Sequence, residues 1–174
     1  MNRSSKIVWL SLFIALGLII FMFESYIPRP LPWLKPGLAN IASLLALYFF
    51  GFQSAMLVIV LRVILGSLLL GSFLNPAFLL SMSGGISATL VMAFMLKYCS
   101  RFFSIVGISI SGAVVHNIVQ LILVMLFIVN QYTILYLMPV MILSSLFSGT
   151  IVAVISHFLI ERLKSVHPIQ PKAG

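Results

Sequence analysis

The chain has 174 residues and a formal net charge of +8, and 62% of its residues are hydrophobic while only 7% are charged. A soluble domain carries about 25% charged residues, so this composition excludes a soluble globular protein and indicates an integral membrane protein. With only two acidic residues and one cysteine, the chain lacks the groups for paired-carboxylate hydrolysis, carboxylate-held Mg²⁺, a cysteine metal cluster or an internal disulfide.

The positive charge does not indicate a nucleic-acid partner, because the basic residues lie near the ends of apolar runs, where they orient membrane proteins. The sequence has no phosphate-binding loop for ATP. We therefore expect neither a metal site nor a cofactor, and we do not expect an enzyme. The composition predicts an all-α bundle of six membrane helices in one domain (1–164), followed by a short tail (165–174).

The first predicted span covers residues 7–26 and is too long for the core of a cleaved signal peptide. Ser11 and Ala15 stand four residues apart, which predicts a helix face that another helix can approach closely. The helix that packs on this face could belong either to a separate partner protein or to the same bundle. Glu24 lies near the outer end of this span, as a site residue or as the interfacial partner of a nearby cation.

The segment 27–36 contains four prolines, which exclude a helix and predict a stiff, extended loop. Trp33 has an apolar body and one polar edge, which suits the membrane interface. Trp33 and Lys35 could belong to a lid over an outward-facing cavity; an interfacial anchor is the alternative interpretation.

The second predicted span covers residues 35–51 and ends at Gly51. Its entrance is unusual, because Lys35 and Asn40 place a cation and an amide where an apolar segment begins. We expect this entrance to form part of a ligand site.

The third predicted span, 55–70, carries Arg62 near its middle. An arginine at this depth costs about 2.5–3.5 kcal/mol on insertion scales, so it is expected to face the protein interior or a water-filled cavity. Arg62 could bind an anion or another ligand. Alternatively, it could form a structural ion pair with Glu24.

The fourth predicted span, 77–98, has many small residues at mid-depth, which indicate close approach of another helix or of a ligand. The fifth, 103–129, contains His116, Asn117 and Gln120 within five positions. Polar side chains at this depth need partners or water. The three residues are candidates for ligand contact, with structural hydrogen bonding as the alternative.

The sixth predicted span covers residues 134–162, where Pro139 predicts either a kink or a local rearrangement that satisfies the freed backbone groups. Six spans place both termini on one side of the membrane. Seven cations then face the cytoplasm and two face outward, which favours cytoplasmic termini in the bacterial inner membrane. The cytoplasmic cations are Arg3, Lys6, Lys97, Arg101, Arg162, Lys164 and Lys172, and the outer ones are Arg29 and Lys35.

Four stretches of the chain resemble one family, the Gx transporter family, also called heptaprenyl diphosphate synthase component I. They are Lys-Pro-Gly-Leu-Ala-Asn (35–40) with the helix that follows it, Leu-Arg-Val-Ile-Leu-Gly (61–66), Leu-Ser-Met-Ser-Gly-Gly (80–85) and Ala-Val-Val-His-Asn-Ile-Val-Gln (113–120). The chain is more distantly similar to the S components of energy-coupling-factor (ECF) vitamin transporters. That resemblance implies six spans, an outward pocket under the first loop, and docking on a scaffold with two ATPases.

The resemblance to S components also implies that small residues four apart on the first span dock the partner, a spacing that Ser11 and Ala15 match. The leading hypothesis is a membrane substrate-binding subunit for uptake of a small, anionic vitamin or metabolite. Its expected ligand contacts are Arg62, Asn40, His116, Asn117, Gln120, Lys35, Trp33 and Glu24. The alternative is a non-catalytic membrane partner of a prenyl diphosphate synthase, or of quinone- or flavin-linked electron transfer.

Overall fold

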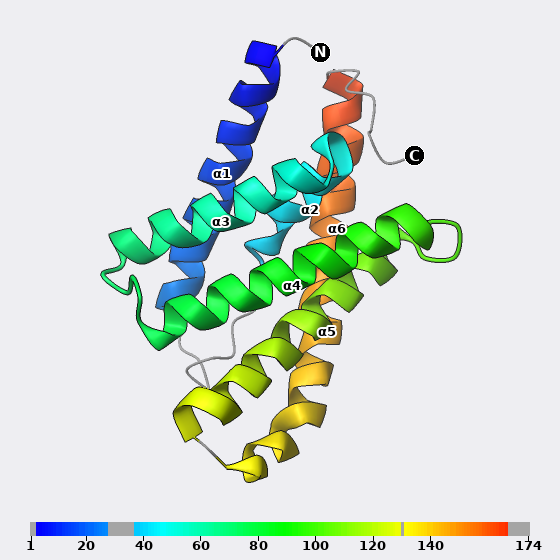
Figure 1. The fold of residues 1–174 in the computed structure, drawn as a ribbon. Helices are drawn as coiled ribbons and strands as arrows, with labels where there is room; N and C mark the ends of the chain where they lie inside the picture. The colour runs from blue at the N-terminus through cyan, green and yellow to red at the C-terminus, as the bar shows by residue number, and fades with distance from the viewer. Residues whose placement is uncertain (1–2, 28–36, 130, 167–174) are drawn as a thin grey trace.

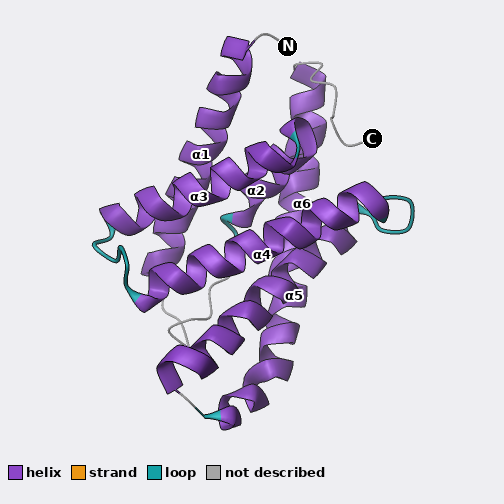
Figure 2. Cartoon of the chain, in the orientation of Figure 1, coloured by secondary structure: helices purple, strands orange, loops and turns teal. Residues whose placement is uncertain are grey.

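The computed structural model describes residues 3–27, 37–129 and 131–166, and within these ranges it contains helices and no strand (Figures 1 and 2). The all-α class predicted from the composition is confirmed. The elements in chain order are α1 (Arg3–Tyr26), α2 (Asn40–Phe50), α3 (Phe52–Leu69), α4 (Pro76–Tyr98), α5 (Ile105–Val124), the π-helical turn η1 (Met125–Val129), the 3₁₀ helix η2 (Tyr132–Leu137) and α6 (Met138–Val166).

Five helical segments of the described chain are long and apolar enough to cross a membrane. They are Ser4–Tyr26, Phe52–Leu69, Pro76–Tyr98, Ile105–Val129 and Tyr132–Ser165. The protein is therefore a multi-pass membrane protein. α2 has 11 residues and extends about 16 Å, about half the ~30 Å hydrocarbon layer. The count of six complete crossings stays a prediction.

α2 begins later than the sequence predicted because the backbone before it turns. Gly37 has φ +73°, in the left-handed region that favours glycine. The N–H of Asn40 donates to the carbonyl of Gly37 and that of Ile41 to the carbonyl of Leu38, each at 3.0 Å. The predicted helix from residue 35 is thus a turn over 37–39 followed by a shorter helix.

α2 forms the centre of the bundle (Figure 1). Every residue of this helix except Tyr48 is buried, and it packs against α1, α3, α4 and α6. Gly51, with φ +82°, is the one residue between α2 and α3. Because α2 is enclosed by other helices, its apolar side chains fill the protein core rather than face lipid.

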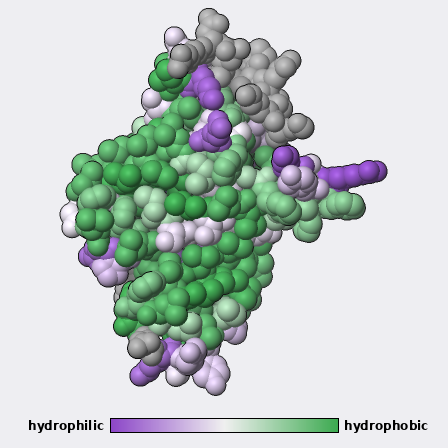
Figure 3. Space-filling view, in the orientation of Figure 1, coloured by the Kyte–Doolittle hydropathy of each residue, from purple (hydrophilic) through white to green (hydrophobic). Residues whose placement is uncertain are grey.

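The outer surface of the bundle is mostly apolar, unlike the surface of a soluble protein. Large apolar side chains such as Phe23 and Phe147 are more than two-thirds exposed. Figure 3 shows apolar residues over most of the visible face and hydrophilic residues mainly at its edges. Such a surface is matched by lipid chains.

The beginning of α1 and the end of α6 lie at the same end of the bundle (Figure 1). This arrangement agrees with the prediction that both termini share one side of the membrane. Pro139 lies in the first turn of α6, which begins at Met138 directly after the 3₁₀ helix η2. Proline is well suited to the first turn of a helix, where its missing N–H has no helical partner to lose.

Candidate functional site

A small polar cavity lies between the first five α-helices, and its volume is about 20 Å³. This space holds about one water molecule. Its lining combines charged, amide, hydroxyl and imidazole groups with glycine and apolar side chains. The lining residues are Phe21, Glu24, Gly37, Ala39, Asn40, Arg62, Val63, Ser81 and His116.

Arg62 is the central charge of this cavity. Its side chain is 3% exposed, and Nη2 donates a hydrogen bond to Oδ1 of Asn40 at 3.3 Å. Within the described residues, Nε and Nη1 of Arg62 have no hydrogen-bond partner. A buried guanidinium with open donors attracts an acceptor or an anion, since unmet buried donors are costly.

Gly17 on α1 makes room for the stem of Arg62. A Cβ at Gly17 would lie 2.9 Å from Cδ of Arg62 and 3.0 Å from Cβ of Ala42. Any side chain at position 17 would therefore press on the arginine and on α2. In the sequence Gly17 is one small residue among many. Its role beside Arg62 could not be predicted, because the sequence does not show that position 17 is buried against the arginine.

Glu24 also lines the cavity and is buried, and its carboxylate accepts a hydrogen bond from the backbone N–H of Leu38. That bond joins the end of α1 to the turn before α2. The negative charge of Glu24 attracts the guanidinium of Arg62, which lines the same cavity. The structure therefore brings together the two buried charges that the sequence suggested as possible partners.

His116 on α5 reaches the cavity over Gly84 on α4. A Cβ at Gly84 would lie 3.0 Å from Nδ1 of His116 and 3.2 Å from Cγ of Gln120. Gln120 does not line the cavity; its Nε2 donates to the carbonyl of Leu80 at 3.4 Å. The small residues of α4 thus serve close approach of α5, and Ser81 lines the cavity beside them.

Asn117 belongs to a different network, although it is adjacent to His116 in the sequence. Its Nδ2 donates to Oγ of Ser145 at 2.7 Å and to the carbonyl of Met141 at 3.3 Å. Both acceptors lie on α6. Asn117 therefore joins α5 to α6 and lies outside the polar cavity, so we leave it out of the proposed site.

The remaining predicted residues lie elsewhere. Trp33 and Lys35 are outside the described residues. Ser11 and Ala15 are exposed on the outer face of α1, away from the cavity. In the described part of the chain, no group of three or more His, Cys, Asp or Glu side chains could hold a metal ion.

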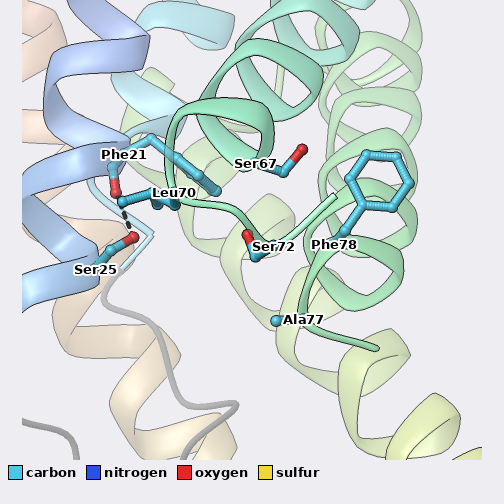
Figure 4. Close-up of a pocket in the computed structure, with 7 residues that line it drawn as sticks. All are labelled: Phe21, Ser25, Ser67, Leu70, Ser72, Ala77 and Phe78. Atoms are coloured by element: carbon cyan, nitrogen blue, oxygen red, sulfur yellow. Dashed lines mark hydrogen bonds between the residues drawn. The ribbon is translucent and has the colours of Figure 1, made fainter. Parts of the chain in front are cut away.

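A second, larger cavity forms a groove between α1, α3 and α4, with a volume of about 290 Å³ (Figure 4). Its lining is mostly apolar, with three serine hydroxyls. The residues are Phe21, Ser25, Ser67, Leu70, Ser72, Ala77 and Phe78. Sequence reasoning did not identify this groove, because its residues have the composition of ordinary packing.

The comparisons with known proteins agree with this architecture. The sequence model of the family described as heptaprenyl diphosphate synthase component I matches residues 13–159. No curated protein matches the chain. The solved S component of a bacterial ECF transporter has a TM-score of 0.72 with this chain at 18% identity, covering 95% of this chain and 98% of that one. The predicted S-component-like fold is confirmed.

Proposed function

This chain belongs to the heptaprenyl diphosphate synthase component I family, and we propose that it is the substrate-binding membrane subunit of an uptake system for a small anionic molecule. The observation that carries this proposal is the buried guanidinium of Arg62 in a cavity shared by five helices. A charge at this position is costly unless it is used or compensated.

In the proposed site, Nε and Nη1 of Arg62 donate to the anionic group of the substrate. Charge-assisted bonds from a guanidinium are directional and strong, and suit carboxylate or phosphate. Asn40 holds the guanidinium from the side through Nη2. His116 and Ser81, which also line the cavity, supply further polar contacts.

Glu24 has a supporting role in this proposal. Its carboxylate balances part of the charge of Arg62 in the empty protein and fixes the turn before α2 through Leu38. Because it also repels an incoming anion, Glu24 limits affinity while it keeps the empty site stable.

We propose that the energy for uptake comes from a separate module of a membrane scaffold and two ATPases, in the bacterial cell membrane. Ser11 and Ala15 would contact the scaffold. They are small, exposed and four residues apart on α1, a spacing that allows a second helix to approach closely.

The test compares small molecules that co-purify with the wild-type chain and with Arg62→Ala, using native mass spectrometry after gentle solubilisation. We expect a bound small anion in the wild type and its loss in Arg62→Ala. Arg101→Ala is the matched control, because Arg101 is exposed outside the cavity, and it should retain the anion. Retention of the same molecule by Arg62→Ala would refute the assignment.

A second candidate function follows from the description of the family. The chain could be the membrane partner of a soluble prenyl diphosphate synthase and recruit that enzyme to the bilayer. The chain itself has only two acidic residues, too few for the carboxylate clusters that hold Mg²⁺ and diphosphate. Co-purification with a soluble prenyltransferase, and without an ATPase scaffold, would favour this candidate over uptake.

A further inference from the structure

Phe21 separates the groove from the polar cavity, because its side chain lines both. The side chain is 6% exposed, and its ring lies directly on Gly66 of α3. A Cβ at Gly66 would lie 2.5 Å from Cδ1 and 2.7 Å from Cε1 of Phe21. The ring thus occupies the space that a side chain at position 66 would otherwise fill.

The two cavities follow each other along the same helices. On α3, Val63 lines the polar cavity and Ser67 lines the groove. On α4, Ser81 lines the polar cavity and Ala77 lines the groove. In each helix the two residues are four apart, which is about 6 Å or one turn. Phe21 therefore stands between two neighbouring spaces.

The chemistry of the two spaces is complementary. The polar cavity contains the guanidinium of Arg62, with two donor atoms that lack a hydrogen-bond partner among the described residues. In the groove, Leu70 and Phe78 supply apolar walls, as Figure 4 shows. The hydroxyls of Ser25 and Ser67 each donate to a carbonyl of their own helix at 2.9 Å. The groove therefore suits an apolar body.

We propose that Phe21 is a movable partition and that the ligand is a single-chain amphipathic anion, with its charged head at Arg62 and its apolar body in the groove. This inference rests on the proposed site at Arg62 and specifies its substrate class. The polar cavity alone, at about 20 Å³, is too small for such a ligand. The groove, at about 290 Å³, lies just below the lower end of the ~300–1,000 Å³ range of ligand pockets.

The occupant is a free amphiphile rather than a phospholipid of the bilayer. A groove of about 290 Å³ has no room for the two acyl chains of a phospholipid. The guanidinium of Arg62, which lines the adjoining polar cavity, fits one anionic head.

The first experiment measures access to the polar cavity and needs no ligand. In a Cys99→Ser background, Ser81→Cys places a thiol in the cavity, and an anionic methanethiosulfonate reagent reports its accessibility in detergent. A minor open state is typically ~0.1–10% populated, so removing the ring with Phe21→Ala should speed labelling about 10- to 1,000-fold. Phe23→Ala is the control, because Phe23 lies on the same helix but is 71% exposed, and it should leave the rate unchanged.

Equal labelling rates in Phe21→Ala and the parent chain would overturn the partition, as would an equal acceleration by Phe23→Ala. If the variant with Ser81→Cys does not fold, Ala39→Cys places the thiol in the same cavity. Because no ligand takes part, a negative result here leaves the proposed uptake function standing.

The second experiment tests the ligand class with defined probes in nanodiscs of zwitterionic lipid. Decyl phosphate should slow labelling of the Phe21→Ala chain, while inorganic phosphate and decanol at the same concentration should not. Adding Arg62→Ala should abolish the protection. Equal protection by inorganic phosphate would overturn the amphipathic class. A parallel arm uses nanodiscs that contain anionic lipid and no added probe; protection there would identify a bilayer lipid as the occupant and overturn the free amphiphile. Protection that survives Arg62→Ala would instead contradict the proposed function.

Discussion

Replacing Glu24 with glutamine tests whether this carboxylate is the charge that makes Arg62 tolerable inside the bundle. The two side chains are 2% and 3% exposed and line one cavity. Glutamine has nearly the same volume, and its carbonyl oxygen can still accept the bond from Leu38. The substitution therefore removes the charge while it keeps the packing and the turn.

Glu24 and Arg62 are opposite charges that line the same buried cavity, so removing one leaves the other uncompensated. When the two charges of a buried ion pair are separated in this way, the cost is about 3–5 kcal/mol. Asn40 still bonds Nη2 of Arg62 in the Glu24→Gln variant, so we expect the lower end, about 3 kcal/mol. For a chain of this size, 1 kcal/mol corresponds to about 2–4 °C in the midpoint of thermal unfolding. The expected decrease is therefore about 6–12 °C.

The assay is thermal unfolding in detergent micelles, followed by circular dichroism and tryptophan fluorescence. Glu161→Gln is the matched control, because Glu161 is exposed and contacts Lys164 at 3.3 Å. An exposed pair of this kind contributes about 0–1 kcal/mol, so the control should unfold within a few degrees of the wild type.

The double variant Glu24→Gln/Arg62→Met completes the cycle. It removes both charges, so it should unfold at a higher temperature than either single variant. If the two single losses simply add, Glu24 and Arg62 do not compensate each other, and the electrostatic account of the cavity is refuted.

Three further predictions concern other parts of the bundle. Asn117→Ala removes the bond to Ser145 on α6 and should cost about 0.6–1.7 kcal/mol, as interhelical bonds in membranes do, with no change in co-purified ligand; loss of the ligand would contradict our placement of this residue. Gly149→Ala would put a Cβ 2.8 Å from Cα of Ile110, a backbone contact that no rotamer relieves, and should lower stability by about 1–3 kcal/mol in thermal unfolding. Ser11→Leu should leave the unfolding midpoint unchanged and reduce co-purification with a scaffold and ATPases; unchanged co-purification would exclude this face as the docking surface.

The sequence identified four of the five polar side chains that line the cavity as candidates, and it missed Ser81. Glu24, Asn40, Arg62 and His116 each interrupt an apolar helix, and such interruptions are costly wherever they occur. The cost of a polar side chain in an apolar helix depends on its depth in the membrane, so these residues can be found without knowing which other residues they contact. The structure adds that all four line one small cavity.

The direction in which a side chain points could not be predicted from polarity. His116 and Asn117 are adjacent and equally polar, yet neighbouring helix positions point about 100° apart. One lines the cavity and the other bonds to α6. Phe21 and Gly17 gave no sequence signal, because phenylalanine and glycine occur throughout such helices and their role comes from what they contact.

The short length of α2 and its burial inside the bundle could also not be predicted from the sequence. Lipid chains and a protein core are about equally apolar, so hydropathy does not distinguish a helix that faces lipid from one enclosed by other helices. The stretch after Asn40 has the composition of a membrane span, but almost all of it is buried inside the bundle. Only the arrangement of the surrounding helices reveals that it forms the core and one wall of the cavity.

In the proposed site, Glu24 stabilises the empty protein but weakens the binding of an anion. These two opposite effects distinguish a binding site from a purely structural charge pair. In the empty protein, Glu24 stabilises Arg62, so Glu24→Gln should lower the unfolding temperature. An anionic ligand competes with Glu24 for the same guanidinium, so that variant should bind decyl phosphate more tightly than the wild type does. Ligand that binds only the folded chain stabilises it by RT ln(1 + [L]/Kd), so decyl phosphate should raise the unfolding temperature of the variant more than that of the wild type. An equal or smaller rise in Glu24→Gln would mean that the anion does not bind at Arg62, and the pair would then be structural.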